Sequence, residues 1–353
     1  MQHPRSVLVN AAGGVSLPVC DHYCGTEARI LKSLALQADL MAQWGACVMD
    51  VTMDCDDGAP AGAERDHALM VCDLARQVFS RDRKAHAAGG VLPRIATRVH
   101  AVGHPAFAQD IQTVVGGAAD VLCHVMIPQV QTLADVEAAV QAVDQACAQS
   151  SRPTTWQPLP LHVLVESPTA VQHVFAIAAH PRVQSISFGL MDFVSAHGGA
   201  IPACAMSVST PAHPTDLDQF HHPLVVQAKL AIASACHAWH KAPSHGVVTE
   251  YGDADALFSA ASLACRAFGF TRMWSIHPDQ VRPILAAFAP PEAEIAQASH
   301  IIRVAASADW APVAVAGRLH DRASFRYFWQ VLERAFQTGR LPPDDPACRF
   351  FVA

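Results

Sequence analysis

The feature that most constrains the fold is the alternation of short apolar runs with longer amphipathic segments along the chain. Short runs rich in Val, Ile and Leu, bounded by turn residues, are typical of buried parallel strands. Eight runs have this character: Ser6–Asn10, Cys47–Met53, Leu92–Val99, Val121–Pro128, Leu161–Glu166, Ser185–Leu190, Gly246–Tyr251 and Arg272–His277. The pattern predicts eight strands.

Helical periodicity fills most of the intervals between these runs. It covers residues 65–79, 133–149, 167–180, 220–240 and 253–269, and Gly269 is expected to end the last of these helices. Eight strands, most of them followed by a helix, predict a TIM (β/α)8 barrel. An open doubly wound sheet is the alternative, but VNAAGG after the first run lacks the GxGxxG pattern of such folds.

The last part of the chain follows a different pattern. A helix is expected at Pro290–Ser307, a hairpin at Trp310–Asp321 and an amphipathic helix at Phe325–Gly339. We therefore expect a barrel domain over residues 1–288 and a C-terminal extension over 289–353. Because the extension is too small to form a substantial core alone, it should pack on the barrel or on a neighbouring subunit.

Composition and net charge exclude some classes of function. With 353 residues, 51% apolar residues and a net charge of −7, the chain can form one large core but lacks the basic surface of a nucleic-acid-binding protein. No apolar run reaches the length of a membrane span and no signal sequence is evident, so we expect a cytoplasmic protein. The eleven cysteines suggest no disulfide framework, and Cys20, His22 and Cys24 complete no recognisable zinc set.

Polar residues cluster at the carboxyl ends of the expected strands, which meet at one mouth of a barrel. They are Asp54, Asp56, Asp57, Arg98, Glu166, Asp192, Glu250 and His277. Glu166 ends a strand, and Ser167 and Pro168 can begin the next helix as its N-cap and first residue. Glu166 and Asp192 follow adjacent strands, so their carboxylates could bind Mg²⁺ or Mn²⁺ together. Arg98 could hold a substrate carboxylate or form a structural salt bridge with Asp54 or Asp57.

An ordered set of motifs carries a family resemblance. MDCDDGAP, TRVH, VMIPQV, LVESPTAV, SFGLMDFVSAHGG, SIHPDQV and AGRLHDRASF resemble those of the citrate lyase β-subunit and malyl-CoA lyase group of the HpcH/HpaI aldolase superfamily. The resemblance implies a TIM barrel, Mg²⁺ dependence and cleavage or formation of a carbon–carbon bond in a 3-hydroxyacyl thioester or a related hydroxy acid. A small oxo or hydroxy acid, with or without a CoA thioester, is the implied ligand.

The same resemblance assigns roles to individual positions. It implies that Glu166 and Asp192 are metal ligands, that Arg98 binds substrate, and that Asp54, Asp56 and Asp57 support the metal's water ligands. Asp321 matches the acid/base aspartate of the extension, which in relatives reaches into a neighbouring subunit. This implies a homotrimer or a multiple of one. Gln129 and His277 are expected to contact substrate.

Departures from the family pattern leave other functions open. Gln129 stands where the family has lysine, Asp56 is one methylene shorter than the family glutamate, and Thr271-Arg272 replaces Gly-Lys. The opening SVLVNAAGG lacks the usual Pro-Gly. The alternatives are a metal-dependent aldolase for free hydroxy-oxo acids that does not use CoA, a thioesterase with the same metal site, and a non-catalytic paralogue that binds metal and metabolite.

Overall fold

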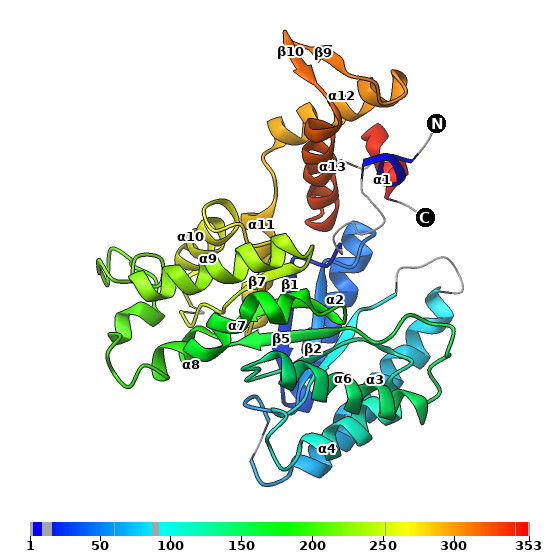
Figure 1. Cartoon of the computed structure of the whole chain (residues 1–353). Coiled ribbons are helices and arrows are strands. Elements are labelled where there is room, and N and C mark those ends of the chain that lie inside the picture. Colours follow the sequence, from blue (N-terminus) through cyan, green and yellow to red (C-terminus); the bar gives the residue numbers. More distant parts are fainter. Residues whose placement is uncertain are drawn as a thin grey trace.

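Eight parallel strands close into a barrel in the order β1 to β8, which confirms the predicted TIM barrel (Figure 1). The structure is a computed structural model that describes residues 3–8, 16–59, 61–86, 92–250, 252–342 and 344–351. The strands are β1 (Cys20–Cys24), β2 (Met49–Asp54), β3 (Ile95–Arg98), β4 (Leu122–Ile127), β5 (Leu161–Val165), β6 (Val183–Phe188), β7 (Ala242–His245) and β8 (Arg272–Ser275). Pairing of β1 with β8 closes the barrel.

The helices surround this barrel, as expected for the fold. They are α2 (Glu27–Trp44), α3 (Glu64–His86), α4 (Phe107–Asp110), α5 (Gly116–Ala118), α6 (Leu133–Ala148), α7 (Pro168–Ala179), α8 (Leu190–Ser195), α9 (Pro223–Ala238), α10 (Ala254–Arg266) and α11 (Val281–Phe288). Short π- or 3-10 segments lie at η1 (Ile111–Val115), η2 (Ala203–Met206) and η3 (Pro278–Gln280). The predicted cap of α7 is confirmed, because the Ser167 hydroxyl accepts a hydrogen bond from the Ala170 amide.

The prediction for the first strand was wrong. Pro4–Leu8 forms a short helix, α1, while Val9 and Asn10 lie outside the described residues. Leu8 is buried in the core of the C-terminal extension, not in the barrel. The first barrel strand is Cys20–Cys24, whose side chains are all buried. Its inward-facing Asp21 interrupts the apolar pattern by which a strand is usually recognised.

The seventh strand also lies elsewhere than predicted. It is Ala242–His245, so Gly246–Val248 and Glu250 belong to the loop that follows it. Gly269 is not the C-cap of α10, a position that Ala267 holds, although Gly269 does adopt the left-handed φ of +73° in the turn beyond. β8 ends at Ser275, two residues before His277.

The C-terminal segment contains the predicted elements. They are α12 (Glu292–Ser307), the antiparallel pair β9 (Val313–Val315) and β10 (Arg318–His320), α13 (Arg322–Gln337) and η4 (Pro346–Phe350). Figure 1 shows this segment standing on one side of the barrel, with the hairpin farthest away. It has a hydrophobic cluster of its own, built around Ile301, Phe325 and Trp329. The division of the chain at residue 288 stays a prediction.

The described helices show no candidate for a membrane span, since none is both long enough and apolar enough to cross a bilayer.

Gly25, which follows β1, lies against the loop that leaves β2. A Cβ atom at Gly25 would come within 1.9 Å of the Gly58 carbonyl oxygen. We predict that Gly25→Ala lowers the free energy of unfolding by about 2 kcal/mol, because backbone must move to relieve the overlap. Gly103→Ala is the matched control: a Cβ there meets nothing within 4 Å, and the change should stay within about 0.5 kcal/mol. Urea denaturation measures both, and equal values would contradict the prediction.

Candidate active site

The barrel interior is built in three layers, because residues two apart on a strand point to the same side. The first layer is polar and includes Asp21, Asp50, Thr52, His124, His162 and Arg272. The second is an apolar cluster of Tyr23, Met126, Leu164, Val247 and Trp274. Most of its members follow a polar residue of the first layer by two positions. The third layer, at the carboxyl ends of the strands, contains Asp54, Arg98 and Glu166.

The polar layer is a closed network of opposite charges. Asp50 accepts hydrogen bonds from Arg94 Nε at 2.6 Å and from Arg272 at 2.7 Å. The same Arg272 nitrogen lies 3.3 Å from Asp21, whose other oxygen accepts a hydrogen bond from Thr52. Burial alone would raise the pKa of Asp21, but Arg272 holds that pKa below its usual value. Two aspartates and two arginines thus neutralise one another, with Asp21, Asp50 and Arg272 buried and Arg94 partly exposed.

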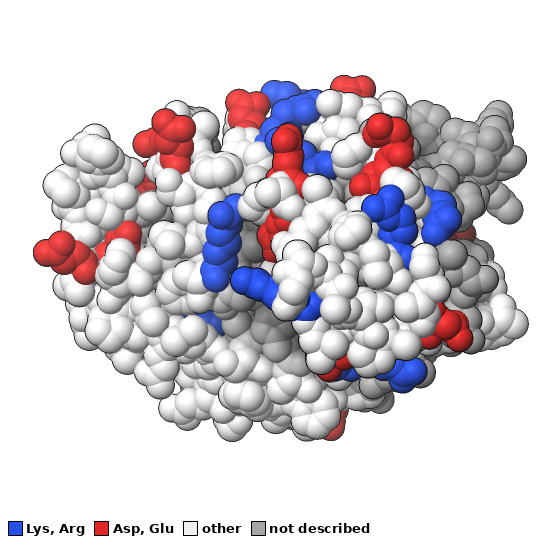
Figure 2. Space-filling model, turned by 90° about the horizontal axis from the view of Figure 1, so that it is seen from above, with Lys and Arg blue, Asp and Glu red and all other residues white. Residues whose placement is uncertain are grey.

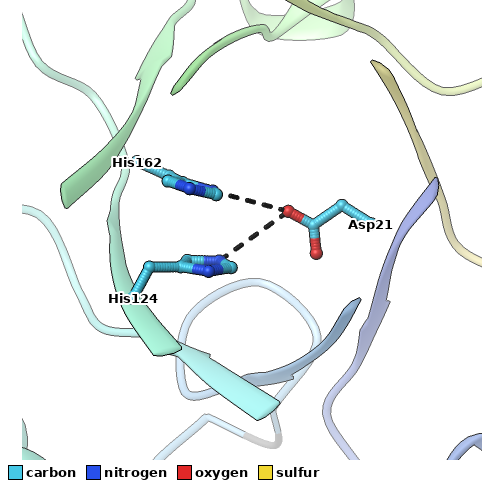
Figure 3. A group of neighbouring side chains, drawn as sticks. All are labelled: Asp21, His124 and His162. Carbon is cyan, nitrogen blue, oxygen red and sulfur yellow. Dashed lines mark ion pairs between the residues drawn. The ribbon is translucent and has the colours of Figure 1, made fainter. Parts of the chain in front are cut away.

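His124 and His162 complete this layer and face Asp21 (Figure 3). A nitrogen of each ring lies 3.8 Å from one Asp21 oxygen, so the three residues are close enough to share a cation. The rings, however, are stacked 3.5 Å apart and only 15° from parallel. Because ring nitrogens direct their lone pairs in the ring plane, parallel rings cannot both point at one metal. A dication would also upset a charge balance that is already complete. We therefore interpret the group as structural.

The mouth begins above the apolar layer with a bidentate ion pair. Arg98 donates from Nε and one terminal nitrogen to the two oxygens of Asp54, at 2.7 and 2.6 Å. Burial would lower the pKa of Arg98, but Asp54 more than offsets this and raises that pKa. The guanidinium also lies 5.6 Å from the centre of the Tyr23 ring. The salt-bridge interpretation of Arg98 is therefore correct for two of its nitrogens.

The third Arg98 nitrogen faces the loop after β2. It lies 3.7 Å from Asp57 and 4.0 Å from Asp56. Burial raises the pKa of Asp56, and one of its oxygens has no hydrogen-bond partner among the described residues. Asp57 is largely exposed. Asp54 orders this loop by accepting hydrogen bonds from the Asp56 and Gly58 amides. The three predicted aspartates are thus gathered around Arg98.

Glu166 lies directly after β5 and is buried, with 6% of its surface exposed. Burial, followed by the nearby charge of Asp192, raises the pKa of Glu166 to about 8. Its Oε1 accepts a hydrogen bond of 2.6 Å from the Gln129 amide. The other oxygen packs against Gly189, where a Cβ atom would come within 2.5 Å of it. A carboxylate fixed on both sides is thereby placed beside another carboxylate.

Asp192, the second predicted ligand, is in the first turn of α8 and exposed. Gly189, the residue before this helix, leaves room for the Glu166 side chain. The two carboxylates therefore come from consecutive β–α units, as the sequence predicted. That they hold a metal stays a prediction at this point.

Gln129 and His277 contribute in ways that the sequence did not reveal. Gln129 has a φ of +52°, which turns its amide toward Glu166 while its side chain is exposed. His277 caps η3, because its Nδ1 accepts a hydrogen bond from the Asp279 amide. Contact of either side chain with substrate stays a prediction.

Asp321 is not in this mouth. It is the N-cap of α13, where it accepts hydrogen bonds from the Ala323 and Ser324 amides, and it is exposed. The other end of α13 contacts Ser16, just before β1, through Gln337. α13 therefore lies at the amino ends of the strands and carries Asp321 away from the barrel (Figure 1).

Tyr23 and Trp274 form a floor below the mouth that the sequence analysis missed. Their rings meet edge to face with centroids 4.8 Å apart. A Cβ atom at Gly246 would lie 3.8 Å from the Trp274 indole nitrogen, which places this ring near the carboxyl end of β7. The alternation of Asp21 and Tyr23 within CDHYC was the available signal, but it was obscured by the cysteines considered as zinc ligands.

A comparison with protein-family models identifies the family of this chain. Residues 34–278, more than half of the chain, match the HpcH/HpaI aldolase/citrate lyase family. The chain belongs to this family. It is accordingly a carbon–carbon lyase, which confirms the predicted family and enzyme class.

Individual relatives agree with this assignment. A citrate lyase of Burkholderia xenovorans LB400 has a solved structure that is 41% identical and aligns over 99% of both chains with a TM-score of 0.74. The L-malyl-CoA/β-methylmalyl-CoA lyase of Rhodobacter capsulatus is 29% identical over 68% of this chain and 76% of its own. The CitE protein of Mycobacterium tuberculosis, at 19% identity, shares the fold over 92% of this chain and 98% of its own, with a TM-score of 0.58.

The contribution of the Arg98–Asp54 ion pair to stability can be tested with a double-mutant cycle. We predict that Arg98→Met costs about 3–5 kcal/mol of stability, because it leaves Asp54 buried without its partner. The double variant Arg98→Met/Asp54→Leu should recover more than half of this loss, since neither charge then remains. Chemical denaturation of both variants and of Asp54→Leu completes the cycle. Additive losses would show that the pair contributes no coupling.

Proposed function

We propose that this enzyme is a Mg²⁺-dependent lyase that cleaves or forms a carbon–carbon bond in a 3-hydroxyacyl-CoA thioester of the malyl-CoA or citramalyl-CoA type. The observation that carries the proposal is the pair Glu166 and Asp192, two carboxylates without a described counter-ion of their own. Arg98, the nearest cation among the groups that act on Glu166, is already bonded to Asp54.

The donor set fits a hard divalent cation. Two carboxylates from rigid positions, with space toward solvent beside the exposed Asp192, suit Mg²⁺ or Mn²⁺ and leave positions for water and substrate. Burial and the charge of Asp192 raise the pKa of Glu166, and a bound cation would offset both effects. When bound, such a metal polarises the oxygens of an oxo acid and stabilises the charge that develops during bond cleavage.

Arg98 has one nitrogen left for catalysis. Two are committed to Asp54, which fixes the plane of the guanidinium, and the third is directed toward the loop of Asp56 and Asp57. That nitrogen can donate to a substrate oxyanion without any rotation of the side chain. Asp54 is thus proposed to position Arg98, and Asp56 and Asp57 are proposed to hold metal-bound water.

The relatives support the choice of ligands. The Rhodobacter capsulatus relative is named for malyl-CoA thioesters, and a Mycobacterium tuberculosis CitE structure was solved with magnesium, acetoacetate and coenzyme A. One observation favours the alternative of a CoA-free aldolase for hydroxy-oxo acids: the neutral Gln129 stands where the family has a lysine, and its side chain is exposed at the mouth. Binding experiments separate the two.

The first test is calorimetry on metal-stripped protein with Mg²⁺ and oxaloacetate or glyoxylate. We expect Glu166→Gln to weaken Mg²⁺-dependent binding of the oxo acid roughly 100-fold or more, because even outer-shell partners of a metal are worth about 10- to 100-fold. The matched control is Glu292→Gln, which removes the same charge from the exposed first turn of α12 and should bind like the wild type. Formation of glyoxylate from malyl-CoA, assayed in parallel, should be lost in Glu166→Gln and retained in the control variant.

Each outcome of this test has a distinct meaning. Heat from acetyl-CoA in the presence of Mg²⁺ and glyoxylate supports the thioester lyase. Oxo-acid binding without any response to acetyl-CoA favours the CoA-free aldolase. Wild-type behaviour of Glu166→Gln would overturn the metal assignment.

We further propose that Asp321 acts in the mouth of a neighbouring subunit, where it exchanges a proton with the enolate carbon of the acyl fragment. Its exposed position at the start of α13, which extends from the amino ends of the strands, supports action between subunits. A cyclic homotrimer or a multiple of one would give each mouth one such aspartate.

Mixed oligomers test this arrangement. We predict that Glu166→Gln and Asp321→Ala are each inactive alone, and that co-expression restores activity. In random trimers roughly a quarter of the mouths would combine an intact Glu166 with a neighbour's intact Asp321. Turnover of the co-purified mixture, compared with the separately purified variants mixed at assay, measures this recovery. A monomeric wild type with full activity would contradict the proposal.

A further inference from the structure

A basic cavity lies at the opposite end of the barrel from the mouth. It has a volume of about 250 Å³ and is bounded by Leu17 before β1, Ala242 at the start of β7, and Thr271 before β8. The facing wall is α13, through Gln330, Glu333, Arg334 and Gln337. The cavity therefore lies between the barrel and the C-terminal extension.

Positive charge predominates in its lining. Among the described residues, Arg5, Lys241 and Arg334 line the cavity against one carboxylate, Glu333. Burial raises the pKa of Glu333, while the charge of Arg5 acts in the opposite direction. A fourth cation, Arg272, is bonded to Asp50 in the barrel interior. Figure 2, which looks from above at the side of the extension, shows Lys and Arg side chains near a hollow in the middle of this face.

The cations of the lining are weakly engaged. Lys241 donates to the His180 carbonyl oxygen at 3.2 Å, and partial burial lowers its pKa. Arg334 makes a contact of 3.8 Å with the Cys265 sulfur. Arg5 lies 3.9 Å from Glu333, beyond hydrogen-bond distance. Donors that lack strong acceptors around a concave space attract anions.

Neutral donors complete the lining. Ser16, Thr271, Gln330 and Gln337 add hydroxyl and amide groups that can bind oxygen atoms of a ligand. His240 also lines the cavity, and its φ of +56° is the left-handed conformation that ends α9, where the Lys241 amide donates to the Cys236 carbonyl oxygen. Thr271 and Arg272 are also the positions where the sequence departs from the family's Gly-Lys.

We propose that this cavity binds a small polyvalent anion, either a polycarboxylate or a phosphate compound, and thereby ties α13 to the barrel. Carboxylate and phosphate oxygens are the groups that arginine and lysine recognise with charge-assisted hydrogen bonds. The site is separate from the lyase mouth, because it lies at the amino ends of the strands while Glu166 and Arg98 lie at the carboxyl ends. It is lined by the helix whose N-cap is Asp321.

Calorimetry on metal-stripped protein at constant ionic strength tests the proposal. One arm uses citrate and the other inorganic pyrophosphate, which distinguishes the two sources of anion. We expect saturable binding of at least one probe, weakened about tenfold or more by Lys241→Gln and by Arg334→Gln. Arg303→Gln, an equal loss of charge on the outer part of α12, is the matched control and should bind like the wild type.

A further variant separates binding from folding. Arg5→Gln changes a side chain that is about half exposed, so it should fold normally and still weaken the probe severalfold. Thermal melting with and without the probe should show stabilisation of the wild type that is reduced in the cavity variants. The proposal is overturned if neither probe binds saturably, or if the cavity variants and Arg303→Gln bind alike.

Discussion

Arg272 and Arg94 donate hydrogen bonds to Asp50, and Arg272 also neutralises Asp21, so the charges in the polar layer at the amino ends of the strands cancel one another. The rest of the interior depends on this balance. Because the buried network needs no further ion, the apolar layer of Tyr23, Met126, Leu164, Val247 and Trp274 can close over it. The mouth then begins with a separate set of charges. In that set Asp54 accepts hydrogen bonds from two of the three Arg98 nitrogens. Burial and the nearby Asp192 raise the pKa of Glu166.

Much of the barrel could be predicted because six strands have apolar runs that overlap their predicted segments, and because the helices between them are amphipathic. The carboxylates at the mouth followed from topology, since adjacent parallel strands bring their carboxyl ends together. The geometry of Glu166 could not be predicted in the same way. It depends on a left-handed Gln129 and on a bare backbone at Gly189, which are properties of the folded chain. The sequence likewise could not reveal that two Arg98 nitrogens bond to Asp54 while the third faces Asp56 and Asp57, because this depends on distances in the folded chain.

The two strands that were placed wrongly share a physical cause. β1 (CDHYC) directs Asp21 into the polar network, and β7 (APSH) contains a proline and no long aliphatic side chain. Both are buried. Asp21 of β1 forms an ion pair with Arg272 of β8, whereas β7 is held by backbone pairing with β6 and β8. A pattern search weighs local apolar character and cannot register such long-range pairing. The apolar Ser6–Leu8, by contrast, belongs to α1 and contributes Leu8 to the core of the extension.

The two ends of the barrel thus carry side chains of opposite charge. At the carboxyl ends Glu166 and Asp192 place two carboxylates beside each other, and at the amino ends Arg5, Lys241 and Arg334 face a cavity with one carboxylate, Glu333. α13 links the basic cavity to the proposed catalytic aspartate, because its last turns line the cavity while its N-cap is Asp321. A ligand that bridges Arg334 and Lys241 would fix this helix relative to its own barrel. If Asp321 serves a neighbour, occupancy of one subunit's cavity would set the geometry of another subunit's mouth, and coupling of this kind must act equally in both directions.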